Sequence, residues 1–161
     1  MKKIKLVISW LLVLLLMVLI FVFSSQKAEA SSETSGGFAE LLARILHSDF
    51  DNLSEYVKID ILNDCQFIVR KTAHFSVYGM LGILSFISCK ASYFKLYWLI
   101  SATICLLYAV SDEIHQYFVE GRSCEIRDVA IDFSGSLTGI IGIFILSFVF
   151  KKIKGKFSKN Y

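Results

Sequence analysis

The chain has 161 residues, enough for one domain, and 55% of them are apolar, with a mean hydropathy of +0.61. This composition excludes an ordinary water-soluble globule and favours a membrane protein. Seventeen basic and 14 acidic residues give a net charge of only +3, so the charge gives no reason to expect a nucleic-acid partner.

Four apolar runs predict four transmembrane helices. They cover residues 6–23, 73–89, 96–111 and 129–150, with lengths close to the roughly 17–25 residues that a membrane-spanning helix needs. We therefore predict an all-α polytopic membrane protein with an extracytoplasmic amphipathic-helical segment between the first and second spans. The expected parts are the N-terminus with the first helix (1–23), an outer loop (24–72), a three-helix membrane core (73–150) and a basic tail (151–161).

Charge placement predicts the orientation in the membrane. A cytoplasmic N-terminus puts ten lysines on the cytoplasmic side, as the positive-inside rule requires: Lys2, Lys3, Lys5, Lys90, Lys95 and the five lysines of residues 151–159. All 14 acidic residues, from Glu29 to Asp132, then lie in the outer segments or at the outer ends of the bordering helices. We expect a multi-pass protein of the cell membrane with both termini in the cytoplasm.

The first span also has the features of a secretory signal. A lysine-rich start precedes it, and Ala28-Glu29-Ala30 follows it with a small-x-small cleavage pattern. However, the apolar run is longer than the roughly 7–15 residues usual for the apolar part of a signal peptide. We therefore favour a retained anchor, with cleavage as the alternative.

The segment between the first two spans changes character twice. Residues 24–37 are rich in Ser, Glu, Thr and Gly, so we predict a flexible loop there. Large apolar residues then recur at helical spacing from Phe38 to Leu46, which predicts an amphipathic helix on the outer leaflet. Residues 49–52 break the pattern, and Ser54 starts a second amphipathic helix that runs into the second span. We interpret both helices as a cover over the bundle, with a partner site as the alternative.

A polar stripe descends into the second span. Arg70, His74 and Tyr78 are four residues apart and therefore share one helix face. Arg70 and Tyr78 suit anchors at the membrane interface. His74 has no such explanation, because an imidazole in the membrane either bonds a neighbouring helix, here through Asp132 or Glu113, or binds a ligand.

The largest set of polar and ionisable residues lies between the third span and the fourth. In chain order it comprises Asp112, Glu113, His115, Gln116, Arg122, Asp128 and Asp132. Ionisable groups where helices enter a bilayer must pair, line a wet cavity or bind a ligand, so they are functional candidates. Gly121 ends the third helix, and the guanidinium of Arg122 can then bind a carboxylate or phosphate through two parallel hydrogen bonds. Asp132 lies one turn below Asp128, where it either pairs with an Arg or His or binds a ligand.

Two glycines in the fourth span predict close helix packing. Gly135 and Gly139 are four residues apart and form a G-x-x-x-G step, which lets another helix approach closely. We predict that they serve packing. A homodimer through the same two glycines is a further expectation.

Several of these segments, in this order and spacing, resemble the VanZ-like family. They are Phe23-Ser24-Ser25-Gln26, Arg70-Lys71-Thr72-Ala73-His74-Phe75 with Tyr78, Asp112-Glu113-Ile114-His115-Gln116, Gly121-Arg122, Asp128 and Asp132-Phe133-Ser134-Gly135. The resemblance covers residues 6–150. It implies a multi-pass bacterial membrane protein, and the founding member of the family is linked to low-level resistance to teicoplanin-type glycopeptides. Glu120 stands where the family commonly has Pro, a departure in the loop that holds Arg122.

Enzymatic, metal-binding and disulfide chemistry have weak sequence signals. No recognised ligand spacing such as H-E-x-x-H is present, so we predict no metal and no cofactor. If the protein is an enzyme, the candidates for general acid and base are His74, Glu113, His115 and Asp132. Cys65 and Cys124 share the predicted outer side and could pair, whereas Cys89 and Cys105 lie in or on the membrane and should stay reduced.

The sequence therefore predicts a non-enzymatic protein of the cell envelope, whose partners are the lipid bilayer and a polar head group at the outer face. The head group belongs to a lipid-linked wall precursor or a phospholipid. The residues expected to bind it are Arg70, Lys71, His74, Asp112, Glu113, His115, Gln116, Arg122, Asp128 and Asp132. A membrane-interface hydrolase or transferase is the alternative, and a small carrier is less favoured because the four spans are continuous.

Overall fold

The structure is a computed structural model that describes the backbone of residues 2–157 and the side chains of residues 3–27 and 34–153. The described part consists of helices joined by short loops and turns, with no strand. Its elements are α1 (Lys2–Ser24), α2 (Ala28–Leu46), the short 3-10 helix η1 (Phe50–Asn52), α3 (Glu55–Ala91), α4 (Tyr97–Tyr117) and α5 (Ile126–Phe157). By length and composition, α1, α3, α4 and α5 are each able to cross a membrane, so the predicted all-α polytopic fold is confirmed.

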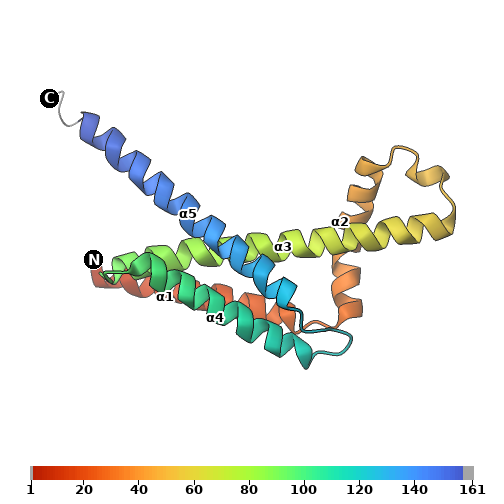
Figure 1. The fold of residues 1–161 in the computed structure, drawn as a ribbon, viewed down its shortest axis with the longest axis horizontal. Coiled ribbons are helices and arrows are strands. Elements are labelled where there is room, and N and C mark those ends of the chain that lie inside the picture. Colours follow the sequence, from red (N-terminus) through yellow and green to blue (C-terminus); the bar gives the residue numbers. More distant parts are fainter. Residues whose placement is uncertain (1, 158–161) are drawn as a thin grey trace.

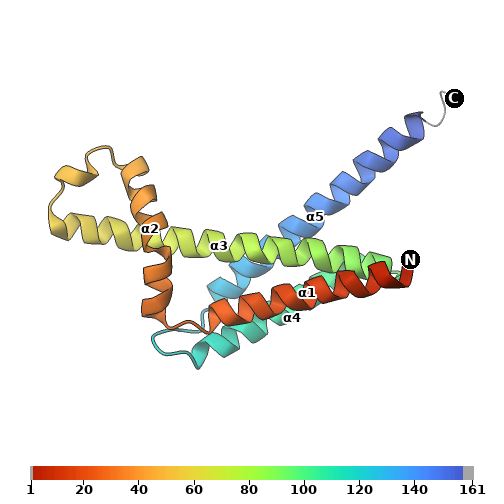
Figure 2. The same cartoon turned by 180° about the vertical axis from the view of Figure 1, so that it is seen from behind.

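Helix α3 is the element against which α1, α2, α4 and α5 all pack. Helices α1 and α4 lie along one half of α3, and α5 crosses α3 and then diverges from the bundle (Figures 1 and 2). α1 and α4 end close to where α5 begins, and we call this the polar end of the bundle (Figure 1). The start of α1 and the end of α5 point toward the opposite end, as four spans require.

Helix α3 is longer than a membrane span needs. It begins at Glu55, directly after Ser54, and continues without a break for 37 residues, or about 55 Å at 1.5 Å per residue. The prediction that the second amphipathic helix runs into the second span is therefore confirmed. Because a bilayer core is about 30 Å thick, the first turns of α3 extend beyond it, and α2 crosses this part (Figure 2).

Glycines set the crossing of α3 and α5. A Cβ atom added at Gly135 would clash with the carbonyl oxygen of Phe75, and one added at Gly139 would clash with the carbonyl oxygen of Gly79. The two backbones can approach only because no side chain separates them, so the predicted packing role of the glycines is confirmed. The face on which we expected a second copy of the chain is covered by α3 of the same chain.

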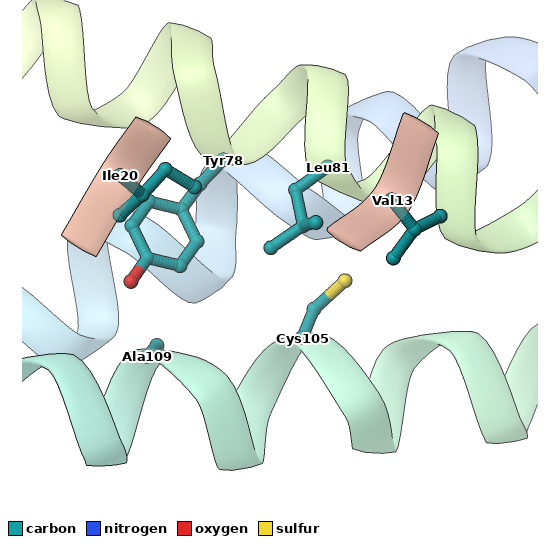
Figure 3. Packing of buried hydrophobic residues seen from close by; sticks show 6 residues of the cluster. All are labelled: Val13, Ile20, Tyr78, Leu81, Cys105 and Ala109. Atoms are coloured by element: carbon teal, nitrogen blue, oxygen red, sulfur yellow. The ribbon is translucent and has the colours of Figure 1, made fainter. Parts of the chain in front are cut away.

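The core of the bundle joins α1, α3 and α4 below the polar end. Its buried residues are Val13, Ile20, Tyr78, Leu81, Cys105 and Ala109 (Figure 3). Tyr78 is completely buried, and its hydroxyl points toward α4. The prediction that Tyr78 anchors the chain at the membrane interface is therefore wrong, because the ring fills the space between three helices and its hydroxyl has a partner there.

The segment after α1 differs most from the prediction. The flexible loop expected over residues 24–37 is wrong from Ala28 onward, where α2 begins. Helix α2 packs its small residues Ala39 and Ala43 against Cys65 of α3 and Phe50 of η1, which stabilises it in spite of its polar composition. Most of the large apolar residues from Phe38 to Leu46 remain exposed on the opposite side, as a helix in contact with a leaflet requires.

The cysteines are all free thiols. Cys65 is buried under α2, while Cys124 is exposed in the connection between α4 and α5, so the two considered as a disulfide pair are not joined. Cys89 and Cys105 are buried in the bundle, in agreement with the expectation that they stay reduced.

Candidate functional site

A single carboxylate joins three helices at the polar end. Asp112 lies in the last turns of α4 and is only 3% exposed. Its Oδ2 accepts hydrogen bonds from Ser24 Oγ of α1 at 2.9 Å, Tyr78 Oη of α3 at 3.2 Å and Gln116 Nε2 at 3.3 Å. Its Oδ1 is buried without a hydrogen-bond partner among the described residues. The side chain is therefore held firmly by one oxygen, and the other is left free.

A second buried carboxylate faces the imidazole of α3. His74 Nδ1 lies 3.6 Å from Asp132 Oδ1, and Asp132 is 1% exposed. This distance is too long for a hydrogen bond. Asp132 Oδ2 is buried and has no hydrogen-bond partner within the described part of the chain. Ligand atoms of His74, Asp112 and Asp132 all lie within 4.8 Å of one another, so α3, α4 and α5 each supply one polar group to the same point.

A largely buried ion pair lies beside His74 and Asp132. Lys71 Nζ contacts Asp128 Oδ2, and both side chains are largely buried, at 18% and 15% exposed. Lys71 is therefore neutralised within the chain. It is less available to an anionic ligand than the prediction assumed.

Two arginines at this end, Arg70 and Arg122, have no carboxylate partner among the described side chains. Arg122 donates from Nε to the carbonyl oxygen of Gln26 at 2.9 Å and from Nη1 to Gln116 Oε1 at 3.1 Å, so its described hydrogen bonds go to neutral oxygens. Gly121, with φ of 77°, makes the turn that brings Arg122 back to the bundle. Arg70 makes no hydrogen bond or ion pair with any residue that the structure describes. Burial, and then the neighbouring Arg70, lower the pKa of Arg122 below its usual value.

A cavity of about 340 Å³ opens beside these residues, between α1, α2 and α3. Its walls are mainly apolar and include Ile20, Phe23, Phe38, Val69, Ala73 and Val77. Arg70, His74 and Arg122 line it as well and supply its ionisable groups. The same three residues, with Lys71, Gln116, Asp128 and Asp132, line a second, narrow cavity of about 10 Å³, so the two cavities adjoin.

Eight of the ten residues expected at the site are thus brought together, and two have other roles. Glu113 is buried, and its Oε2 accepts the backbone N–H of Glu125 at 3.1 Å, directly before α5 begins. His115 points to α1, where its ring stacks on Phe21 at a centroid distance of 4.3 Å and its Nε2 lies 3.0 Å from Ser25 Oγ. Both residues hold helices in place rather than lining the cavities.

Three further residues belong to the site although they were not among those predicted. Ser24 and Tyr78 bond Asp112, and Gln26 supplies the carbonyl oxygen that Arg122 binds. Ser24 and Gln26 lie in the Phe23-Ser24-Ser25-Gln26 segment that carried part of the family resemblance, which was the available signal. Tyr78 lies on the same helical stripe as His74, and that stripe is its signal in the sequence.

Comparison with protein families gives one match. A family model described as VanZ/LLP1 matches residues 9–149, which is most of the chain. Neither the comparison with curated proteins nor the comparison with solved structures found a matching protein.

Proposed function

The chain belongs to the VanZ/LLP1 family, and we propose that it is a cell-envelope membrane protein that binds an anionic lipid head group at the polar end of its bundle. The lipid is a lipid-linked wall precursor or a phospholipid. Binding would change what a glycopeptide can reach at the cell surface and so give low-level tolerance to teicoplanin-type glycopeptides. In this proposal the polar end faces outward, and both termini are cytoplasmic.

The observation that carries the proposal is the pairing of an apolar cavity with two unneutralised arginines. The cavity of about 340 Å³ is large enough for a small ligand and has mostly apolar walls, which suit acyl or prenyl carbons. Arg70 and Arg122 border it without a carboxylate partner among the described side chains. Planar guanidinium groups bind phosphate oxygens in pairs, so one amphipathic molecule would match both parts of the cavity.

The two arginines also support an anionic ligand in the large cavity that they line. Two like charges held near one another repel, and burial removes the water that would otherwise screen them. A phosphate placed between Arg70 and Arg122 would relieve both effects. Asp112, Glu113 and Asp128 offset part of the cost for Arg122, but none of them forms an ion pair with either arginine among the described residues, because Asp128 is bound to Lys71 and Asp112 is bound to neutral donors.

The test is a lipid-retention measurement on purified full-length protein. We expect native mass spectrometry to detect bound anionic lipid on the wild type and much less on Arg70→Lys, which keeps the charge but loses the planar fork. Arg70 has no described hydrogen bond to lose, so the fold should be unaffected. Arg127→Lys is the matched control, since Arg127 is exposed and pairs with Glu125 outside the cavity.

The same variants test the cellular role. A host that expresses the chain should tolerate more teicoplanin than a host with an empty vector, and Arg70→Lys should abolish this difference at unchanged protein abundance. Full tolerance in cells that express Arg70→Lys, or equal lipid retention by the two arginine variants, would contradict the proposal.

A hydrolase or transferase is the second candidate, and one observation favours it. His74 both lines the large cavity and faces the buried carboxylate of Asp132, as a general base oriented by an acid would. The other two proposed acid–base residues, Glu113 and His115, are engaged in packing. Incubation with phosphatidylglycerol and with a short-chain polyprenyl diphosphate, followed by product analysis, tests this candidate, and His74→Ala is the matched variant.

A further inference from the structure

We propose that His74, Asp112 and Asp132 form a binding site for a divalent first-row cation, with Zn²⁺ as the preferred ion. Suitable atoms of the three residues lie within 4.8 Å of one another, and each residue comes from a different helix. The inference goes beyond head-group binding and does not depend on it, because it rests on other atoms of the polar end.

Two buried oxygen atoms without partners point to a missing ligand. Asp112 Oδ1 and Asp132 Oδ2 make no hydrogen bond to any described residue, although their side chains are 3% and 1% exposed. A buried carboxylate oxygen without a donor carries a large desolvation cost, and nearly all such atoms in folded proteins have a partner. A bound cation would satisfy both atoms at once.

The distance between His74 and Asp132 fits a metal better than a direct bond. At 3.6 Å, Nδ1 and Oδ1 are too far apart for a hydrogen bond. Ligand atoms about 2.1 Å from a tetrahedral zinc ion are about 3.4 Å apart, so the imidazole and the carboxylate are close enough to be neighbouring ligands once Asp132 Oδ2 faces the ion. The upper separation of 4.8 Å exceeds this spacing by about 1.4 Å, so the three side chains must approach one another by up to that amount when the ion binds.

Neighbouring side chains already orient one of the ligands. Ser24, Tyr78 and Gln116 all donate to Oδ2 of Asp112, which leaves Oδ1 as its free oxygen. Hydrogen bonds of this kind fix a metal-binding carboxylate in natural sites. Because the three donors come from α1, α3 and α4, the packing of the bundle itself holds Asp112 in place.

Nearby basic residues do not neutralise the two carboxylates. Arg122 donates to Gln26 and Gln116, and Lys71 pairs with Asp128. Of the described charged side chains at this end that are buried or half-buried, five are acidic (Asp112, Glu113, Glu125, Asp128 and Asp132) and three are basic (Arg70, Lys71 and Arg122). The excess negative charge lies deep in the bundle, where a cation would be stabilised most.

The donor set selects the kind of ion. One imidazole nitrogen with two carboxylate oxygens suits Zn²⁺ or Mn²⁺, whereas Ca²⁺ takes six to eight oxygen ligands and Mg²⁺ prefers oxygen alone. Three protein ligands leave one position of a tetrahedral ion open. His74 and Asp132 border the cavity of about 10 Å³, which is roughly the volume that one water molecule needs, so an open position there has room for a water or a head-group oxygen.

The test measures zinc on the full-length chain in detergent, purified without a histidine tag, in a Cys124→Ser background and after treatment with chelator. Cys124 is the exposed thiol, and its replacement prevents zinc from binding there. We expect elemental analysis after desalting to give one zinc per chain, and titration with Zn²⁺ alone to raise the melting temperature. Cobalt substituted for zinc should give the visible absorption of a tetrahedral site.

Variants separate this site from adventitious binding. His74→Gln and Asp132→Asn should each weaken zinc binding at least about 10-fold and abolish the cobalt spectrum. His47→Gln is the matched control, because His47 is exposed between α2 and η1 and should leave binding unchanged. If Asp132→Asn does not accumulate, His74→Gln on the less buried residue decides the question.

Three results would overturn the proposal: zinc well below one per chain, equal affinity in His74→Gln and His47→Gln, or a cobalt spectrum without tetrahedral bands. The zinc titration contains no added lipid, and the lipid measurement can be made in the presence of chelator. Failure of one proposal is therefore distinguishable from failure of the other.

Discussion

Asp112 is the residue on which the polar end depends. Its Oδ2 binds donors from α1, α3 and α4, so one atom connects helices that are distant in the sequence. A charged acceptor with several donors forms stronger hydrogen bonds than a neutral one, and in a buried place the loss of a donor is not replaced by water. Each donor should therefore contribute measurably to stability.

Tyr78→Phe tests this at the level of one hydroxyl group. The substitution keeps the ring that fills the core and removes only the donor to Asp112, so we expect a loss of about 1–3 kcal/mol in the free energy of unfolding. Thermal melting in detergent measures it. Tyr117→Phe changes an exposed ring on α4 and should have no effect, and an equal loss in both variants would contradict the role of the hydroxyl.

The Lys71–Asp128 ion pair should behave as a buried pair. Lys71→Met leaves Asp128 charged and largely buried, so we expect destabilisation of about 3–5 kcal/mol, with partial recovery in the double variant Lys71→Met/Asp128→Asn. The exposed pair of Lys27 and Glu120 is the control, and Lys27→Met should cost at most about 1 kcal/mol. Equal costs for the two lysines, measured by denaturant titration, would show that the Lys71–Asp128 pair is solvated.

Among the elements, the crossing of α3 and α5 depends most on particular residues. Gly135 and Gly139 of α5 contact backbone atoms of α3, while Gly142, one turn further along, has open space around it. The same helix thus contains glycines that packing requires and one that it does not.

Alanine substitutions should therefore have opposite effects on α5. Gly139→Ala places a methyl group against the backbone of Gly79, and overpacking of this kind costs typically 1–3 kcal/mol or more. Gly142→Ala meets nothing and removes a poor helix former, so we expect stability unchanged or raised by up to about 1 kcal/mol. The folded amount in membranes and the melting temperature measure both. Similar abundance and melting of the two variants would contradict the close crossing.

The elements were more predictable from the sequence than the site. Apolar runs and charge placement predict the four spans because length and hydrophobicity decide them locally. The predicted amphipathic helix over residues 38–46 forms the second half of α2, whereas the first half was missed because the Ser, Glu, Thr and Gly of residues 28–37 predict a loop. Helical spacing also placed His115 near Asp112 on one face, and both contact the end of α1, but only Asp112 also reaches α3, through Tyr78.

At the level of the whole molecule, the positions of the helix ends are consistent with a bundle that crosses the membrane four times. Its large apolar side chains on α1 and on the later half of α5 are exposed, which suits lipid rather than water. The orientation proposed above puts the polar end, and with it Cys124, outside the cell.

Cys124 provides a direct test of that orientation. It is the exposed cysteine at the polar end, while Cys65, Cys89 and Cys105 are buried. A membrane-impermeant maleimide added to intact cells should label the wild type and leave Cys124→Ala unlabelled. If labelling appears only after the cells are lysed, the polar end faces the cytoplasm and the proposed topology is wrong.

Residues at and just after the end of α1 form hydrogen bonds with residues of α4 and of the α4–α5 connection, which lie far away in the sequence. Ser24 binds Asp112, 88 positions later, and Gln26 binds Arg122, 96 positions later. During synthesis, α1 therefore enters the membrane long before its partners exist, and the polar end cannot form until α4 and α5 have followed. Until all these helices are in place, Asp112 and Asp132 lie at the membrane without the polar residues that surround them in the folded bundle. Proteolytic removal of α1 after Ala30 would also take away Ser24 and Gln26, so a chain processed as a secretory protein would lose part of its own site.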